Sequence, residues 1–162
     1  MKLERNQIVK PFCTLETERP WGYYGLYADN VKSTTKILYV KKGEMLSLQY
    51  HFKRSQLYVI LDNNFLIEYS NEQIPLDIIN DENEDRKTKN FKTFLEENLI
   101  TVEANEGEMF CFKKRVIHRS TYNGNREYGR FLDVAFGINM EEGDIIRIED
   151  KYGRADITNL KI

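Results

Sequence analysis

The chain contains two histidines, His51 and His118, and each follows an apolar, strand-like run that begins with Gly-Glu-Met. Two such similar runs favour two hairpin-like halves that bring one imidazole each to a common place. Neutral imidazole nitrogens and amide oxygens are metal ligands, and Gln49 and Gln56 lie close to His51 in the sequence. The sequence therefore predicts a mononuclear metal site formed by Gln49, His51, Gln56 and His118. Two ordinary hydrogen-bonded histidines on half-buried strands explain the same pattern about equally well.

Charged residues near the histidines suggest further chemistry. All four candidate ligands are neutral, so no carboxylate balances a divalent charge, and we expect the metal to bind weakly or to be absent. Asp133 is the nearest strand acid that could face the same cavity; the alternative is an outward surface acid. Lys53, Arg54, Arg115 and Arg119 flank the histidines and would suit a phosphate or carboxylate group on a small ligand. Solvated charges at strand ends are the alternative interpretation.

Alternating apolar and polar residues indicate strands that would position this site. Over residues 45–52 the period of two places Gln49 and His51 on one face. Short strands are also predicted at 33–40, 56–61, 65–69, 99–102, 109–112, 115–121 and 128–137, with Gly and Asn in the turns between them. Residues 1–18 are expected to form an N-terminal arm. Residues 71–99 are charged and are predicted to be a weakly structured insertion, with one or two helical turns at 91–98. The sequence predicts one all-β domain over 1–162.

Composition excludes several classes of function. The net charge is −2 with the basic residues dispersed, so we expect no nucleic-acid partner. No run approaches membrane-spanning length, and the N-terminus lacks the apolar core of a signal peptide, so we expect a cytoplasmic protein without a membrane partner. Cys13 and Cys111 lie far apart, which supports neither a disulfide framework nor a thiolate zinc site. Dinucleotide-binding, P-loop and nucleophile-elbow motifs are missing from the sequence.

The spacing of these residues resembles a known superfamily. Gly43, Gln49, His51, Gln56 and Asn63, followed by Gly107, His118 and Asn123, resemble the two motifs of the cupins. Within the cupins, RPWG at 19–22, Lys36, SLQYH at 47–51, Arg54, His118-Arg119 and IIRIEDKYGR at 145–154 are similar to the C-terminal domain of type II mannose-6-phosphate isomerases, often fused to mannose-1-phosphate guanylyltransferase. The resemblance covers about residues 18–154.

This resemblance implies a cupin double-stranded β-helix, or jelly-roll barrel. It implies metal-dependent aldose-ketose isomerisation of a hexose phosphate, in nucleotide-sugar or polysaccharide precursor metabolism, by a homodimer. The ion, Zn²⁺ or Mn²⁺, would be held by Gln49, His51, Gln56 and His118. Asp133 would be the base, assisted by Arg54 or Lys53, and the sugar phosphate would be bound by Lys36, Arg54, Arg115 and Arg119.

Gln56 departs from the family pattern, because it stands where the family has a glutamate. An amide cannot act as an acid or a base, which leaves two other functions open. The first is a non-catalytic cupin that binds a sugar or sugar phosphate and has a degraded metal site. The second is a metal-free nucleotide-sugar epimerase that uses His118 together with Asp133.

Overall fold

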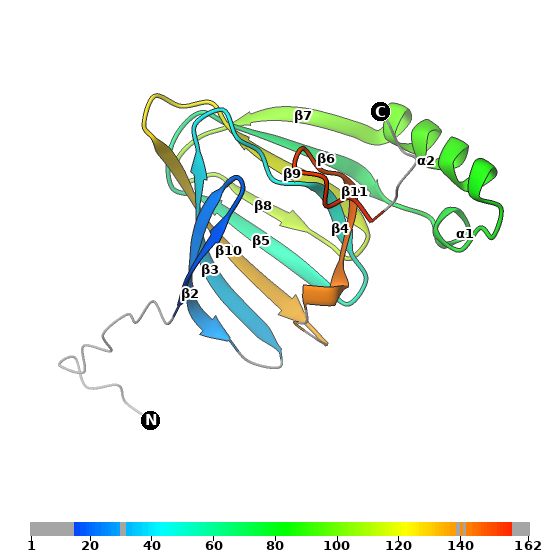
Figure 1. The fold of residues 1–162 in the computed structure, drawn as a ribbon, viewed down its shortest axis with the longest axis horizontal. Helices are drawn as coiled ribbons and strands as arrows, with labels where there is room; N and C mark the ends of the chain where they lie inside the picture. The colour runs from blue at the N-terminus through cyan, green and yellow to red at the C-terminus, as the bar shows by residue number, and fades with distance from the viewer. Residues whose placement is uncertain (1–14, 30–31, 139, 141, 157–162) are drawn as a thin grey trace.

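Two antiparallel β-sheets that face one another make up most of the computed structural model, which describes residues 15–29, 32–138, 140 and 142–156 (Figure 1). The first sheet has the order β1 (Leu15–Arg19), β2 (Gly22–Asp29), β3 (Ser33–Lys41), β10 (Tyr128–Gly137), β5 (Arg54–Ile60), β8 (Met109–Phe112). The second has the order β11 (Ile145–Glu149), β4 (Leu48–His51), β9 (Val116–Tyr122), β6 (Phe65–Gln73), β7 (Leu99–Ala104). The all-β prediction is confirmed. A 3₁₀ turn at Glu142–Asp144 leads into β11.

Both Gly-Glu-Met runs begin at a glycine with positive φ. The φ angles are 75° at Gly43 and 90° at Gly107, which other residues rarely adopt. The amide N–H of Gly43 donates to the carbonyl of Tyr122, and that of Gly107 to the carbonyl of Ile60, both at 2.9 Å. Each glycine therefore supports a tight turn that redirects the chain toward a new strand.

Strand β4 is buried on both of its faces. Leu48 and Tyr50 belong to an apolar cluster on the side of the second sheet that the helices cover. Gln49 and His51 alternate with them and so point to the opposite side, toward the first sheet. The sequence prediction that Gln49 and His51 share one face is consistent with this burial.

The charged insertion is more ordered than the sequence predicts. It contains α1 (Leu76–Ile79) and α2 (Glu84–Asn98), which lie together at one end of the second sheet (Figure 1). The side chain of Asn83 caps α2 by accepting from the N–H of Arg86 at 2.9 Å. Phe91, Phe94 and Leu95 are buried from one face of the helix. The expectation of one or two turns was wrong, because the charged residues before Phe91 form the first turns of an amphipathic helix.

Two predicted boundaries also change. Strand β6 extends to Gln73 and β7 begins at Leu99, so the insertion occupies residues 74–98. Residues 1–14 of the predicted N-terminal arm lie outside the described residues, and residues 15–18 are part of β1. Within the described ranges, the helices are too short or too polar to cross a membrane.

Candidate functional site

A cavity of about 420 Å³ opens between the two sheets. Strands β3, β5 and β10 of the first sheet contribute its lining, and β4, β11 and the segment after β11 contribute from the second sheet. The polar and charged residues that line it are Glu18, Arg19, Thr34, Lys36, Ser47, Gln49, Arg54, Gln56, Tyr58, Asp133, Arg147 and Arg154. Trp21 and Tyr24 add aromatic surface. This mixture is typical of a site for a small polar ligand.

Three of the lining residues stand in one row across the first sheet. Asp133 on β10 is paired with Lys36 on β3 and with Tyr58 on β5, so the three side chains point to the same face. Burial raises the pKa of Asp133 to about 6, and the positive charges of Lys36 and Arg54 act against this rise. Asp133 is therefore a carboxyl group with an unusual proton affinity on the cavity wall.

The two histidines come together, as the sequence predicts. β4 pairs with β9, where Gln49 is opposite His118, and the ring centroids of His51 and His118 are 5.4 Å apart. The side-chain amide oxygen of Gln56 lies 2.8 Å from Nε2 of His51 and 2.7 Å from Nε2 of His118. As placed, the amide nitrogen of Gln56 donates to both carboxyl oxygens of Asp133 at 3.2 Å. We call these four residues, His51, Gln56, His118 and Asp133, the histidine cluster.

The far side of each imidazole is held by the backbone. Nδ1 of His51 is 3.1 Å from the carbonyl oxygen of Asp144, and Nδ1 of His118 is 3.0 Å from that of Val116. The ring of Phe112 stacks on His118 at 4.4 Å between centroids. Burial, with the neighbouring His118 and Arg54 charges, lowers the pKa of His51 to about 2. Burial also lowers the pKa of His118 to about 4, so both rings are neutral at pH 7.

Gln56 separates the imidazoles from the cavity. Gln56 belongs to the cavity lining, whereas His51 and His118 lie behind it and are 3% and 1% exposed. A ligand in the cavity would therefore touch the amide of Gln56 before it reached an imidazole. The pair His118 and Asp133, which an epimerase would need, is connected only through that amide.

The residues present do not fit a resident divalent ion in this arrangement. The two Nε2 atoms converge on one point, but the Gln56 amide occupies that point. The amide oxygen of Gln49 accepts from the hydroxyl of Ser47 at 2.7 Å. Across the described ranges, no three His, Cys, Asp or Glu side chains gather as a metal-binding group. A divalent ion needs anionic or several converging donors, so we derive no reaction step through a metal.

Three cations predicted to bind substrate lie away from the cavity lining. Lys53 is exposed in the turn between β4 and β5, where its backbone N–H donates to the carboxylate of Asp144 at 3.0 Å. Arg115 donates to the carbonyl of Ile74 and to the side chain of Gln73, both at 2.8 Å. These positions follow β4 and β8, so their side chains emerge at turns and not between the sheets.

Arg119 also points away from the cavity. It follows His118 directly on β9, and strand alternation sends it to the opposite face. Its guanidinium donates to Glu68 at 2.7 Å and pairs with Glu149 at 3.3 Å. Of the predicted ligand-binding cations, Lys36 and Arg54 are the ones that line the cavity.

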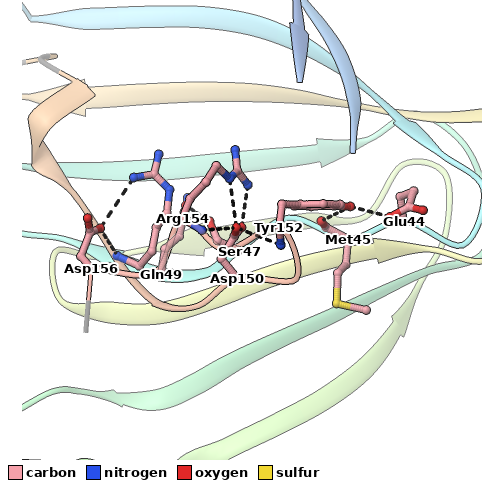
Figure 2. Close-up of polar contacts among 9 residues, drawn as sticks. Glu44, Met45, Ser47, Gln49, Asp150, Tyr152, Arg154 and Asp156 are labelled. Carbon is pink, nitrogen blue, oxygen red and sulfur yellow. Dashed lines mark hydrogen bonds and ion pairs between the residues drawn. The ribbon is translucent and has the colours of Figure 1, made fainter. Parts of the chain in front are cut away.

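Strand β11 and the segment after it supply two cavity-lining cations, Arg147 and Arg154, that the sequence analysis missed. Figure 2 shows Arg154 beside Asp150, with Tyr152 reaching toward Glu44. The Asp150 carboxylate accepts from the Arg154 guanidinium at 2.6 Å and from the backbone N–H of Tyr152 at 3.1 Å. The Tyr152 hydroxyl donates to Glu44 at 2.5 Å, which fastens the segment over the start of the β4 region. The two arginines of the IIRIEDKYGR motif, Arg147 and Arg154, could have indicated these cavity-lining cations from the sequence.

Solved structures share the fold of this chain. The chain aligns with oxalate decarboxylase from Bacillus subtilis with a TM-score of 0.57, at 12% identity, over 82% of this chain and 29% of that chain. It aligns with the capsular polysaccharide assembling protein CapF from Staphylococcus aureus with a TM-score of 0.56, at 10% identity, over 84% of this chain and 34% of that chain. At such identities the likeness concerns the fold alone. The protein has the cupin double-stranded β-helix that its motifs predict.

Sequence comparison then narrows the resemblance. Residues 10–86 match the family model "Mannose-6-phosphate isomerase C-terminal", a range that includes Gln49, His51 and Gln56. The mannose-1-phosphate guanylyltransferase of Klebsiella pneumoniae is 27% identical over 152 residues, which are 94% of this chain and 26% of that protein. The chain thus spans about a quarter of the length of this curated relative. The resemblance to the mannose-6-phosphate isomerase C-terminal domain is confirmed.

Proposed function

We propose that the cavity binds a sugar phosphate or a similarly anionic sugar derivative. The observation that carries this proposal is the excess of positive charge in the cavity lining. Five cations, Arg19, Lys36, Arg54, Arg147 and Arg154, face the cavity together with two acids, Glu18 and Asp133. A cavity between low-dielectric walls concentrates such a charge imbalance and favours an anion. Arginine is well suited to phosphate because its planar guanidinium donates two parallel hydrogen bonds.

The remaining lining supports a sugar as the uncharged part of the ligand. Small ligands occupy cavities of roughly 300–1,000 Å³, and this cavity has about 420 Å³. The Ser47, Gln49 and Thr34 side chains offer hydrogen bonds to hydroxyl groups. Tyr24 offers an aromatic face beside the Lys36 ammonium, which lies 4.7 Å from the ring centroid. The family match and the guanylyltransferase relative support the same ligand class.

Calorimetric titration with mannose 6-phosphate tests this proposal, with mannose and inorganic phosphate as controls. We expect mannose 6-phosphate to bind at least about tenfold more tightly than mannose, because a phosphate adds charge-assisted hydrogen bonds. Equal binding of the two sugars, or no binding of any phosphorylated sugar from a small panel, would contradict it.

Isomerisation of a hexose phosphate is a second candidate, favoured by the row of Lys36, Asp133 and Tyr58. An ionised Asp133 would take the proton from C2 of an open-chain aldose and return it to C1. In the same conversion O1 gains a proton and O2 loses one. The Lys36 ammonium would stabilise the negative charge that develops on O1. The raised pKa of Asp133 suits proton transfer near neutral pH.

Turnover separates the two candidates. An isomerase would interconvert mannose 6-phosphate and fructose 6-phosphate, and Asp133→Asn would abolish turnover while leaving ligand affinity within about tenfold. Adding Zn²⁺ or Mn²⁺, or a chelator, would test the metal dependence that the resemblance implies. Binding without turnover under all these conditions supports the binding function alone.

A further inference from the structure

The donors and acceptors of the histidine cluster can be assigned from the backbone outward. Carbonyl oxygens accept hydrogen bonds and never donate them. The carbonyls of Asp144 and Val116 face Nδ1 of His51 and of His118 at 3.1 and 3.0 Å, so each Nδ1 carries the hydrogen. A neutral imidazole has one N–H, which leaves the Nε2 atom of each ring as an acceptor.

Both Nε2 atoms then require a donor, but the atom of Gln56 that faces both of them, at 2.8 and 2.7 Å, is placed as the amide oxygen. An amide oxygen cannot donate, whereas an amide nitrogen carries two N–H groups, one for each imidazole. The two ends of a glutamine amide have nearly the same shape, so their identity follows from the hydrogen-bond partners. An oxygen here would require two charged imidazoles with ring centroids 5.4 Å apart, both buried.

We propose that Gln56 directs its amide nitrogen to the two histidines and its amide oxygen to Asp133, so that its NH₂ group fills the position of a metal ion. The histidines keep the orientation of metal ligands, since Nδ1–H groups bound to backbone carbonyls are usual behind a metal-bound Nε2. Gln56 is thus a positioning residue that satisfies both imidazoles without a cation. In the histidine cluster, the side chain of Gln56 thus occupies the position that a metal ion would take between the two imidazoles.

The assignment also affects Asp133. With the two ends of the amide exchanged, the amide oxygen takes the place of the nitrogen that lies 3.2 Å from both carboxyl oxygens. This is accommodated when one carboxyl oxygen carries a proton and donates it to the amide oxygen. A protonated Asp133 has a single O–H, which it donates to Gln56, and it is not a base. A neutral Asp133 favours the binding function over isomerisation, although the inference about Gln56 does not depend on either function.

Nitrogen-15 NMR of the histidine side chains in the full chain tests the assignment directly. We expect both histidines to be neutral and protonated on Nδ1 at pH 5.5, where Asp133, with its pKa of about 6, is protonated, although neutral imidazole free in water prefers the other tautomer. Gln49→Ala is the matched control, because the Gln49 amide accepts from Ser47 and the variant should leave both tautomers unchanged. A hydrogen on Nε2 of either histidine in the unaltered protein would overturn the proposal.

Zinc titration of Gln56→Glu supplies a second, independent test. A carboxylate has only acceptors, so it cannot bridge two Nε2 lone pairs, and an ion can. We expect the variant to melt at a lower temperature than the original chain without metal and to recover with one equivalent of Zn²⁺. Its affinity for Zn²⁺ should exceed that of the original chain by about tenfold or more, since the ion no longer displaces two amide hydrogen bonds. Equal zinc affinity of the two proteins would overturn the proposal, as would tight zinc binding by the original chain that His51→Ala abolishes.

Discussion

The histidine cluster and the cationic lining of the cavity differ in how their polar groups are satisfied. In the cluster, all four imidazole nitrogens have partners within 3.1 Å. In the lining, the buried Nε of Arg147 has no hydrogen-bond partner in the described part of the chain. Buried polar groups without partners are rare and often mark a place that a ligand completes. The two histidines therefore behave as part of the core, and the cationic lining is the part suited to bind a ligand.

Their positions explain this difference. The cluster lies between the sheets against Tyr58 and Phe112, where burial makes an unpaired polar group costly. Arg147 and Arg154 belong to β11 and the segment after it, at the cavity wall. The histidines, whose chemistry is obvious from the sequence, thus belong to the core, whereas Arg147 and Arg154 line the cavity that we propose binds a ligand.

Replacing His118 with alanine should have the largest effect on stability. The side chain is 1% exposed, stacks on Phe112 and bonds to Gln56, so the variant leaves a cavity and an unsatisfied amide. We expect the free energy of unfolding to fall by about 3 kcal/mol in urea denaturation. A loss below about 1 kcal/mol would mean that the cluster is not part of the core.

Replacing Arg147 with glutamine should weaken ligand binding and leave stability almost unchanged. We expect the affinity for a sugar phosphate to fall by about tenfold to hundredfold, which is the usual value of one charged hydrogen bond. Stability should change little, because the ion pair of Arg147 with Asp156 is long, at 3.6 Å, and partly exposed. Arg126→Gln is the matched control, since Arg126 pairs with Asp62 outside the cavity lining. Similar affinity losses in both variants would indicate a general charge effect.

Acidification should destabilise the protein through the cluster. Below pH 6.5 the unfolded chain protonates both histidines, whereas the folded pKa values of about 2 for His51 and about 4 for His118 keep these rings neutral. Asp133 reduces this loss of stability below pH 6, because its raised pKa lets the native state bind a proton at a higher pH than the unfolded state does. Between pH 6 and pH 4 the unfolded state gains one proton net, so stability should fall by about 1.4 kcal/mol per pH unit.

Urea denaturation at several pH values between 6 and 4 measures this slope. Asp133→Asn removes the opposing contribution, so its slope should be about twice as steep. Stability that stayed level or rose on acidification would show that the histidines are not held neutral.

Replacing Asn83 with alanine should have the smallest effect and should leave ligand binding unchanged. The variant removes the cap of α2, which contributes about 1 kcal/mol to the free energy of unfolding. The helix covers the outer side of the second sheet, opposite to the face that carries Gln49 and His51. Calorimetry of this variant measures how far a pure stability loss alters ligand affinity. A loss of affinity above about threefold would mean that the second sheet transmits changes to the cavity.

Strand alternation made part of the site predictable. The period of two in β4 gave the common face of Gln49 and His51, and the two Gly-Glu-Met runs gave the meeting of the histidines. The same rule, applied to β9, would have excluded Arg119, which is adjacent to His118. Lys53 and Arg115 could not be placed in this way, because a turn residue points where the turn geometry directs it. The length of α2 was underestimated because its charged first turns have no apolar periodicity.

The amino-acid sequence by itself determined the all-β fold, the resemblance to the mannose-6-phosphate isomerase C-terminal domain, and the glutamine at the position of the family's carboxylate. Tertiary structure decided what that glutamine does. Sequence spacing shows which residues share a strand face, but donors and acceptors meet across strands that are distant in the chain. Only the packed sheets bring Gln56 between His51 and His118, and place Arg147 and Arg154 on the wall of the same cavity.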